Sequence, residues 1–371
     1  MTSVPTHLFC FSHLRWNFVY QRPQHLLSRA ARSLSVFYIE EPVFSDGEAR
    51  TRISTDESCG VVVVTPILPE GLCKEKAHSA LRGVVNELIA DVQPSRWVTW
   101  YYTPMALEFT RHLQPDVRVY DNMDELSAFA GAPQGLLDLE RELIAKSDLI
   151  FVGGQSLYEA KRDRHDSIHV FPSSVDASHF RVARQRAADP DDQRRIPHPR
   201  IGFFGVIDER MDLDIVAGVA ALRPQWQLVM LGPTAKISPH SLPRAANIHW
   251  LGCKHYQELP SYLSGWDVGI MPFALNDATR FISPTKTPEF LAAGVPVVST
   301  AIADVVNPYG DAGHVEIASN PEEFVAKIEL LLSRPKASWL NSVDERLAEM
   351  SWDKTWARMM LHMAGVGGRS N

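Results

Sequence analysis

The sequence predicts an α/β protein made of two doubly wound domains that face a cleft. Short apolar runs rich in Val, Ile and Phe alternate with amphipathic stretches along almost the whole chain. The apolar runs are nearly uninterrupted, which is typical of parallel strands covered on both faces, and right-handed crossovers between such strands give doubly wound sheets. A polar, charged stretch at residues 182–200 breaks this alternation and divides the chain into two halves.

The first half is expected to contain seven strands and three helices. The strands are expected in the runs THLFCFSH, SVFYIEE, GVVVVTP, SRWVTWYY, VRVYDNM, SDLIFVG and SIHVFPSS. The helices are expected in RPQHLLSRAARS, in residues 74–90 and in GLLDLERELIAK. A buried helical face is visible in the first of these, where leucines and alanines recur at helical spacing.

The second half repeats the pattern with five strands and three helices. Its strands are expected in RIGFFG, WQLVMLGP, NIHWLG, WDVGIMPF and VPVVST, and its helices in LDIVAGVAALR, YQELPSYLSG and PEEFVAKIELLLS. We therefore predict a Rossmann-like N-terminal domain over residues 1–182, a linker over 183–199 and a Rossmann-like C-terminal domain over 200–350. Residues 351–371 begin with SWDKTWARMMLHMAG, which predicts a final amphipathic helix.

Composition narrows the functional classes. The 371 residues are 45% hydrophobic and 22% charged, with a net charge of −7, so a nucleic-acid partner is not expected. None of the four cysteines share a CxxC spacing, so neither a zinc site nor dithiol redox chemistry is expected. The start of the chain has no signal-peptide pattern and no apolar run reaches 18 residues, so we expect a cytoplasmic protein.

The densest motif is SPTKTPEFLAAGVPVVST, residues 283–300. Thr287 suits a helix N-cap, Pro288 the first helical position and Gly294 the left-handed position after the helix, so a helix is expected over 288–293 before a buried strand. Ordinary helix capping would explain these residues by itself. The functional interpretation is a nucleotide site, because a helix N-terminus beside Lys286 suits a phosphate and a Glu289 carboxylate could accept both ribose hydroxyls.

This motif resembles the nucleotide-sugar site of GT-B glycosyltransferases, especially the family 4-like group, in which SP-x-K-x-x-E-(F/Y)-L-A-A-G-x-P-V-V recurs. The matching residues are Ser283, Pro284, Lys286, Glu289, Phe290, Leu291, Ala292, Ala293, Gly294, Pro296, Val297 and Val298. Two further segments, PSSVDASHF at 172–180 and RIGFFGVID at 200–208, resemble the segments that close the first GT-B domain and open the second. The resemblance also implies that the final helix crosses back onto the N-terminal domain.

The resemblance implies roles for particular residues. Glu289 is expected to bind the ribose and Lys286 the diphosphate, with Ser283, Pro284 and Thr285 completing the donor site. Gly205 is expected to let backbone N–H groups approach the phosphates. Arg210 is expected either to contact a phosphate or to be an ordinary surface arginine.

The sequence departs from the family pattern at one position. Many family 4 enzymes carry a second acid eight residues before the ribose-binding one, and here that position is Phe281. The missing contact to the donor sugar is either absent or supplied elsewhere, with Asn276 and Asp277 as candidates.

Residues 12–31, SHLRWNFVYQRPQHLLSRAA, form the other dense stretch. It resembles the opening SH-x-R-W-x-x-x-x-Q-R-P-Q-H of a subgroup of bacterial glycosyltransferases. Aromatic rings stack on sugars, and arginine and amide groups hold hydroxyls or phosphates, so we expect an acceptor or cleft site; interdomain packing is the alternative. The residues expected there are His13, Arg15, Trp16, Asn17, Gln21 and Arg22.

A catalytic base is expected in VYDNMDELSAF, residues 119–129. Inverting transfer to a hydroxyl needs a group that accepts its proton. Asp124 is the first candidate and Asp121 the second, with neighbouring acids raising the pKa of the base. The alternative is that Asp124 caps the following helix.

The expected function is transfer of a sugar from a nucleoside diphosphate, with UDP as the expected nucleotide, to a hydroxyl of a glycan or lipid-linked acceptor in polysaccharide biosynthesis. Lys286 would stabilise the leaving diphosphate, and no metal or other cofactor is expected. Contact with the inner face of a membrane is a further possibility. The alternatives are an epimerase or phosphorylase of the same fold and a non-catalytic nucleotide-sugar-binding scaffold.

Overall fold

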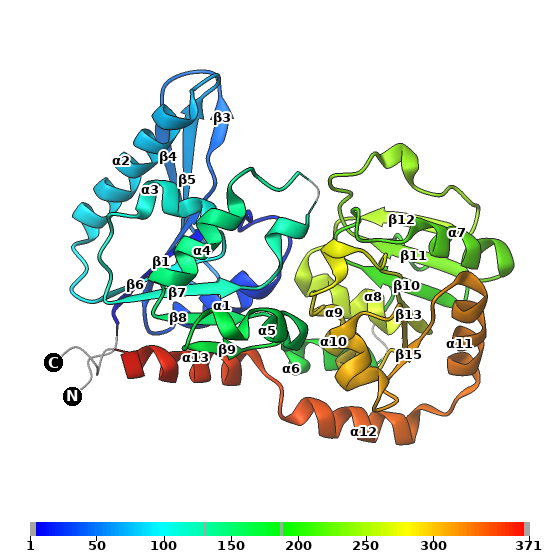
Figure 1. Ribbon diagram of the computed structural model, residues 1–371. Coiled ribbons are helices and arrows are strands. Elements are labelled where there is room, and N and C mark those ends of the chain that lie inside the picture. The colour runs from blue at the N-terminus through cyan, green and yellow to red at the C-terminus, as the bar shows by residue number, and fades with distance from the viewer. Residues whose placement is uncertain (1–4, 130, 186–187, 367–371) are drawn as a thin grey trace.

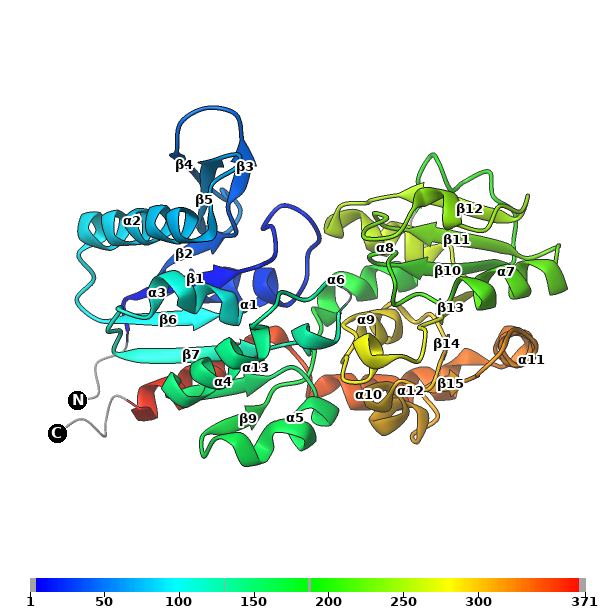
Figure 2. The same cartoon turned by 45° about the horizontal axis from the view of Figure 1, so that its top comes forward.

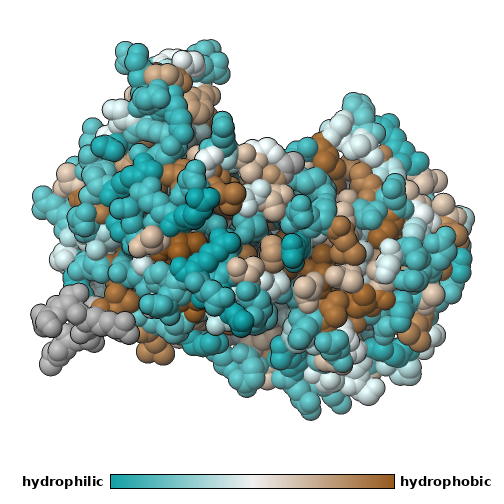
Figure 3. All heavy atoms as spheres, in the orientation of Figure 1, coloured by the Kyte–Doolittle hydropathy of each residue, from teal (hydrophilic) through white to brown (hydrophobic). Residues whose placement is uncertain are grey.

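The computed structural model describes residues 5–129, 131–185 and 188–366. Two α/β domains lie side by side, and the chain passes between them twice (Figures 1 and 2). The predicted fold of two doubly wound sheets is confirmed. In the space-filling view the two lobes are separated by a notch at the upper edge (Figure 3).

The N-terminal domain is built on a nine-stranded sheet with the order β3-β5-β2-β1-β6-β7-β8-β9, in which β4 pairs only with β5. Every pairing is parallel except that of β4 with β5. The strands are β1 (His7–Ser12), β2 (Ser35–Glu40), β3 (Val43–Ser45), β4 (Arg50–Thr55), β5 (Val62–Pro69), β6 (Trp97–Tyr101), β7 (Val117–Asn122), β8 (Leu149–Val152) and β9 (Ile168–Val170). The helices are α1 (Arg22–Ala30), α2 (Lys74–Val92), α3 (Leu107–Thr110), α4 (Leu136–Lys146) and α5 (Gln155–Lys161).

The C-terminal domain has a parallel six-stranded sheet with the order β12-β11-β10-β13-β14-β15. The strands are β10 (Arg200–Phe204), β11 (Gln227–Leu231), β12 (Ile248–Gly252), β13 (Val268–Met271), β14 (Val297–Ser299) and β15 (Val315–Ile317). The helices are α7 (Leu213–Leu222), α8 (Leu259–Ser264), α9 (Lys286–Ala293), α10 (Ala303–Val305), α11 (Pro321–Ser333) and α12 (Lys336–Ala348).

The segment between the domains belongs largely to the C-terminal domain. The short helix α6 (Ala177–Arg181) packs against α9, and the side chains of Val175, Phe180 and Ala183 are buried in the core of the C-terminal domain. The packing of that domain therefore begins near residue 175, whereas the sequence placed residues up to 182 in the N-terminal domain. The reason is that the apolar side chains of PSSVDASHF bury against the second sheet.

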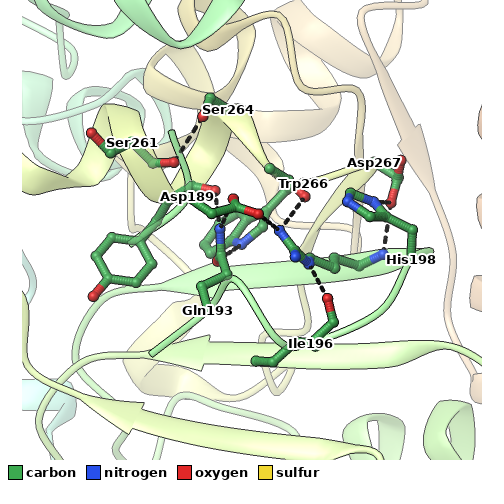
Figure 4. A network of polar contacts seen from close by, with 11 residues as sticks. Asp189, Gln193, Ile196, His198, Ser261, Ser264, Trp266 and Asp267 are labelled. Carbon is green, nitrogen blue, oxygen red and sulfur yellow. Dashed lines mark hydrogen bonds and ion pairs between the residues drawn. The ribbon is translucent and has the colours of Figure 1, made fainter. Parts of the chain in front are cut away.

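Polar contacts fix the predicted linker to the same domain. The Arg200 guanidinium donates to the Asp189 carboxylate at 2.7 Å, and the Trp266 indole donates to the Gln193 side-chain oxygen at 2.8 Å. Figure 4 shows this network, in which Gln193 of the linker bonds to Asp189 and to Trp266. The absence of helical or strand periodicity in residues 188–199 thus reflects an irregular segment held by side-chain hydrogen bonds.

The final helix, α13 (Trp352–Val366), lies along α1 of the N-terminal domain. Trp352, Trp356, Met359 and Met363 are buried in the N-terminal core, which confirms that the C-terminal helix crosses back. Within the part of the chain that the structure describes, no helix is both long and apolar enough to span a membrane.

Candidate active site

One cavity lies between the two domains, where strands of both sheets end. The empty space within it, including space open to solvent, is about 640 Å³. Its lining comes from the loops after β1, β7 and β8 on one side and from those after β10 and β13 and the start of α9 on the other. The lining residues are Gln21, Arg22, Met123, Asp124, Gly153, Ser173, Val206, Arg210, Phe273, Ile282, Ser283, Pro284, Thr285 and Lys286.

The cavity brings together candidates predicted from both halves of the chain. The predicted residues Gln21, Arg22, Asp124 and Arg210, together with residues 283–286, all line it. The sequence analysis missed Met123, Ser173, Phe273 and Ile282. Ser173 donates a hydrogen bond of 2.6 Å to the backbone oxygen of Ser283 and so joins the domain crossover to the donor loop. A serine in PSS carries no signal for such a contact.

Helix α9 starts earlier than the sequence suggested. Thr285, not Thr287, is at the N-cap position, and the helix runs from Lys286. Thr287 is buried in the first turn, with its hydroxyl 3.6 Å from the sulfur of Met271. The predicted end is confirmed, since Gly294 has a left-handed φ of 74°. The first turn of the helix therefore begins at the cavity. Within this turn the N–H group of Thr287 donates to the backbone oxygen of Pro284 at 3.2 Å, and Pro288 has no N–H group.

Lys286 reaches the cavity by crossing over a glycine. Gly205 has a φ of 136°, and a Cβ atom there would lie 2.0 Å from Cε and 2.6 Å from Nζ of Lys286. The ammonium group lies near the rings of Phe203 and Phe273. Burial lowers the pKa of Lys286, Arg210 lowers it further, and Glu289 and Asp208 oppose these effects. Glycine at 205 thus allows a close approach of the lysine to the turn after β10.

We expect Gly205→Ala to weaken UDP binding by roughly tenfold or more, because the new methyl group would displace the Lys286 side chain. Gly252→Ala is the matched control, since Gly252 also has a left-handed φ, of 72°, but has no atom within 4 Å of its added Cβ. Both changes place a side chain at positive φ and should lower the thermal midpoint, Gly205→Ala by more because its added methyl group also meets Lys286. Calorimetric titration with UDP tests this. Equal UDP affinities in the two variants would show that Lys286 does not need this passage.

Glu289 lies behind the cavity rather than on its surface. Its side chain is 4% exposed, and it is not among the residues that line the cavity. Burial raises the pKa of Glu289, and the neighbouring Lys286 opposes this rise. The charge of Glu289 contributes to a raised pKa of Tyr256, so the two residues lie near each other. The ring of Tyr256 stacks on the ring of Tyr20, with 4.4 Å between the ring centroids. The predicted ribose site is therefore nearly enclosed.

Arg210 is held in place by Asp208. Its Nε donates to Oδ1 of Asp208 at 3.0 Å and its Nη2 to Oδ2 at 2.6 Å. The side chain of Arg210 is three-quarters covered and lines the cavity, so it is not a solvated surface arginine. Asp208, which the sequence analysis did not single out, could have been suggested by its D-x-R spacing. Nη1 of Arg210 takes part in neither of these two bonds, so it is the nitrogen that suits a phosphate.

The expectation that Asp121 could act as a base is wrong. Its carboxylate is completely buried and accepts hydrogen bonds from Nε and Nη2 of Arg22 at 3.0 and 2.8 Å. Nη1 of Arg22 donates to the backbone oxygen of Phe171 at 2.7 Å. Since both partners are buried, Asp121 compensates the charge of Arg22 and fixes its side chain at the cavity wall.

Asp124 lies at the cavity with the electrostatics of a candidate base. Burial raises its pKa, and Arg210, Arg22 and Lys286 oppose this rise. Burial, and not mainly neighbouring acids, is therefore the cause of the shift. The alternative role as a helix cap is not realised, because Glu125 occupies the N-cap position of the short 3₁₀ helix Leu126–Ala128.

The aromatic Trp16 and the basic Arg15 of the predicted acceptor loop point away from the cavity. The Trp16 ring is buried in the N-terminal core, and its indole N–H donates to Asp56 at 2.7 Å. Arg15 pairs with Glu40 at 3.2 Å. These two residues make neither the predicted acceptor site nor the interdomain packing of the alternative. They pack within the N-terminal domain, because the loop folds back onto β2 and onto the turn after β4.

The other two residues of that loop also do not line the cavity. Asn17 is exposed. His13 is half-buried at the end of β1, and its pKa is lowered to about 4 by burial and by the charge of Lys236 from the other domain. His13 thus marks the interdomain boundary without facing the donor loop.

The suggested replacements for the missing acid are not at the cavity either. Asn276 and Asp277 are both exposed, and the side-chain oxygen of Asn276 accepts from the Thr279 backbone N–H at 3.2 Å. Phe281 packs against the hydrophobic cluster of the N-terminal domain. The position that carries an acid in many family 4 enzymes here contributes to interdomain packing.

Comparison with known proteins gives this geometry a context. Residues 198–334, which contain Arg210 and the lining residues 283–286, match the family described as glycosyl transferases group 1. The chain is also 27% identical over 278 residues to the putative teichuronic acid biosynthesis glycosyltransferase TuaH of Bacillus subtilis (strain 168), covering 68% of each chain. These findings identify a glycosyltransferase.

Solved structures agree on the fold of this glycosyltransferase. Sucrose-phosphate synthase from Thermosynechococcus elongatus is similar with a TM-score of 0.72 and 13% identity, over 98% of this chain and 100% of that one. HepE from Anabaena, in complex with UDP and glucose, gives a TM-score of 0.67 and 12% identity, over 97% and 99% of the two chains. The architecture is therefore the GT-B fold.

Proposed function

We propose that this glycosyltransferase moves a sugar from a UDP-sugar to a hydroxyl of a glycan or lipid-linked acceptor in the cavity between its domains. The observation that carries the proposal is the wall formed by Lys286, Arg210 and the start of α9 in the C-terminal domain, opposite Asp124 of the N-terminal domain. A diphosphate suits this wall because a helix N-terminus and two cations converge on it. The complex of HepE with UDP and glucose supports the choice of nucleotide.

Charge stabilisation would be the main contribution of the donor wall. As the bond between the sugar and the diphosphate breaks, negative charge grows on the leaving phosphate. Lys286 and Nη1 of Arg210 would neutralise it in a site largely shielded from water, where such interactions are strongest. Asp208 holds Arg210 before the donor arrives, so little reorganisation is needed.

Because these cations would supply the charge compensation, the reaction is proposed to proceed without a divalent metal. We expect donor consumption by the purified protein to be unchanged by EDTA. The assay would offer a panel of UDP-sugars with and without a polysaccharide acceptor and would separate products by mass. Loss of activity in EDTA that Mg²⁺ or Mn²⁺ restores would overturn this part of the proposal. Sugar conversion without an acceptor would instead indicate an epimerase.

Asp124 is proposed as the base that accepts the proton of the acceptor hydroxyl. Its raised pKa means that the protonated, inactive form persists to a higher pH than for an ordinary aspartate. Turnover should therefore fall as pH is lowered through this raised pKa. Asp124→Asn should lower kcat by roughly 10²–10⁴-fold and remove the acidic limb of the pH profile. An unchanged acidic limb in the variant would assign the base elsewhere.

The acceptor is proposed to be a growing polysaccharide or a lipid-linked precursor, with the reaction on the cytoplasmic side and contact with the inner face of a membrane. The name of TuaH, which refers to teichuronic acid biosynthesis, supports an acceptor of this class. Sedimentation of the protein with vesicles of bacterial lipid extract would test the membrane contact.

A further inference from the structure

We propose that Phe129 is a positioning residue that fastens segment 123–129 of the N-terminal domain to cations of the C-terminal domain and so holds Asp124 at the cavity. The proposal deepens the proposed function and rests on it for the role of Asp124. Nothing in the sequence motif of the donor site involves Phe129, which was not among the predicted site residues.

The ring of Phe129 meets two cations from two different loops. The guanidinium carbon of Arg210, after β10, lies 5.5 Å from the ring centroid, and Nζ of Lys236, after β11, lies 4.9 Å from it. A cation within about 6 Å of an aromatic centroid is attracted by the negative face of the ring. One ring of the N-terminal domain therefore bridges two charged groups of the C-terminal domain.

Both cations are held by their own domain. Arg210 is bonded to Asp208 through Nε and Nη2. Lys236 has a φ of 61°, a left-handed conformation that residues other than glycine rarely adopt, and its Nζ is 3.8 Å from Oε1 of Glu209. Asp208 thus orients Arg210, so the ring docks onto one cation that the C-terminal domain already holds, while Lys236 is half-exposed and more loosely paired.

The segment that ends at Phe129 is also fixed at its other end. It leaves β7 at Met123, whose backbone oxygen would lie 2.5 Å from a Cβ atom at Gly153, so the segment packs closely on the turn after β8. Between the two attachments, the 3₁₀ helix Leu126–Ala128 contacts residues Asp277–Thr279 of the C-terminal domain. Asp124 lies within this span. Its own domain holds it through Asn122, which donates to its backbone oxygen at 2.8 Å, and through the neighbouring Glu125, which pairs with Lys161 at 2.9 Å; Phe129 adds the attachment to the other domain.

Arg210 links this attachment to the donor. It lines the cavity and is proposed to contact the diphosphate, while the same guanidinium group lies over Phe129. The ring thereby ties the proposed base to the cation of the leaving group. A leucine at 129 would keep apolar bulk but lose the negative face, whereas a tyrosine would keep that face.

Hydrogen–deuterium exchange of the full chain without ligand tests the proposal. Amides of residues 125–129 should exchange about fivefold faster in Phe129→Leu than in the wild type. Phe129→Tyr should restore the wild-type rate. Phe44→Leu is the control, since Phe44 is a half-exposed phenylalanine of the same domain at β3. Phe129→Leu should also lower kcat severalfold while the Kd for UDP stays within twofold of the wild-type value, because the donor wall is intact.

Exchange that is equally slow in Phe129→Leu and the wild type would overturn the proposal, as would exchange that is equally fast in the leucine and tyrosine variants. A Kd for UDP that rises together with the exchange rate would also overturn it, since Phe129 would then support the donor wall itself. Failure of the wild type to bind UDP would instead overturn the proposed donor site, while the exchange result would still decide the attachment.

Discussion

Replacing Lys286 with methionine is expected to lower kcat by roughly 10²–10³-fold and to weaken UDP binding by about tenfold, because the lysine would stabilise charge that grows on the leaving diphosphate. The effect on turnover should exceed that on binding, since the charge is larger in the transition state than in the bound donor. Steady-state kinetics with the active UDP-sugar and calorimetry with UDP would measure the two effects separately.

The fold should survive this substitution. Lys286 lowers the pKa of the buried Glu289, so its removal raises that pKa further and the carboxyl group becomes neutral instead of remaining as an unpaired buried charge. Lys327→Met, which removes a partly exposed lysine paired with Glu316 at 2.9 Å, is the matched control in the same domain. Equal kinetics for Lys286→Met and the wild type would place the lysine outside the reaction.

Replacing Glu289 with glutamine is expected to weaken UDP binding by roughly tenfold, because the amide keeps one acceptor oxygen and cannot accept from both ribose hydroxyls. The amide keeps the size of the side chain, so packing around α9 should be preserved. Glu258→Gln is the control, because Glu258 is also a first-turn acid of a helix but bonds the exposed backbone N–H of His255.

A second nucleotide makes the ribose assignment specific. Wild-type protein should bind UDP more tightly than 2′-deoxy-UDP, while Glu289→Gln should bind the two equally. Since the carboxylate is 4% exposed and lies beside Tyr256, binding to the ribose would also require the surrounding side chains to move. Persistent discrimination against the deoxy nucleotide in the variant would remove Glu289 from the ribose site.

The sequence was informative where burial or a dense motif left a pattern. All twelve predicted strands lie in the two sheets, because apolar runs covered on both faces are readable without a partner. The strands β3, β4 and β15 were missed. Every residue of β4 is exposed, so no apolar alternation marks it, while β3 and β15 have only three residues each.

The site residues, too, could be predicted only where the sequence carries a local signal. Residues 283–286 were found because the motif is contiguous, and Asp124 because it follows a strand. Asp121 was misassigned because its partner, Arg22, is 99 residues away, and pairing of that kind has no local signal. The roles of Trp16 and Phe281 likewise depend on neighbours distant in the chain, which only the folded structure reveals.

The crossing of α13 has a consequence for how the protein is made. The N-terminal core contains side chains from segments that are far apart in the chain, such as Leu8 of β1 and Met363 of α13. During synthesis the first domain therefore emerges with a hydrophobic surface beside α1 that stays uncovered until α13 has left the ribosome. Its final stability is reached only after the second domain has been translated, so the two halves mature together and not in succession.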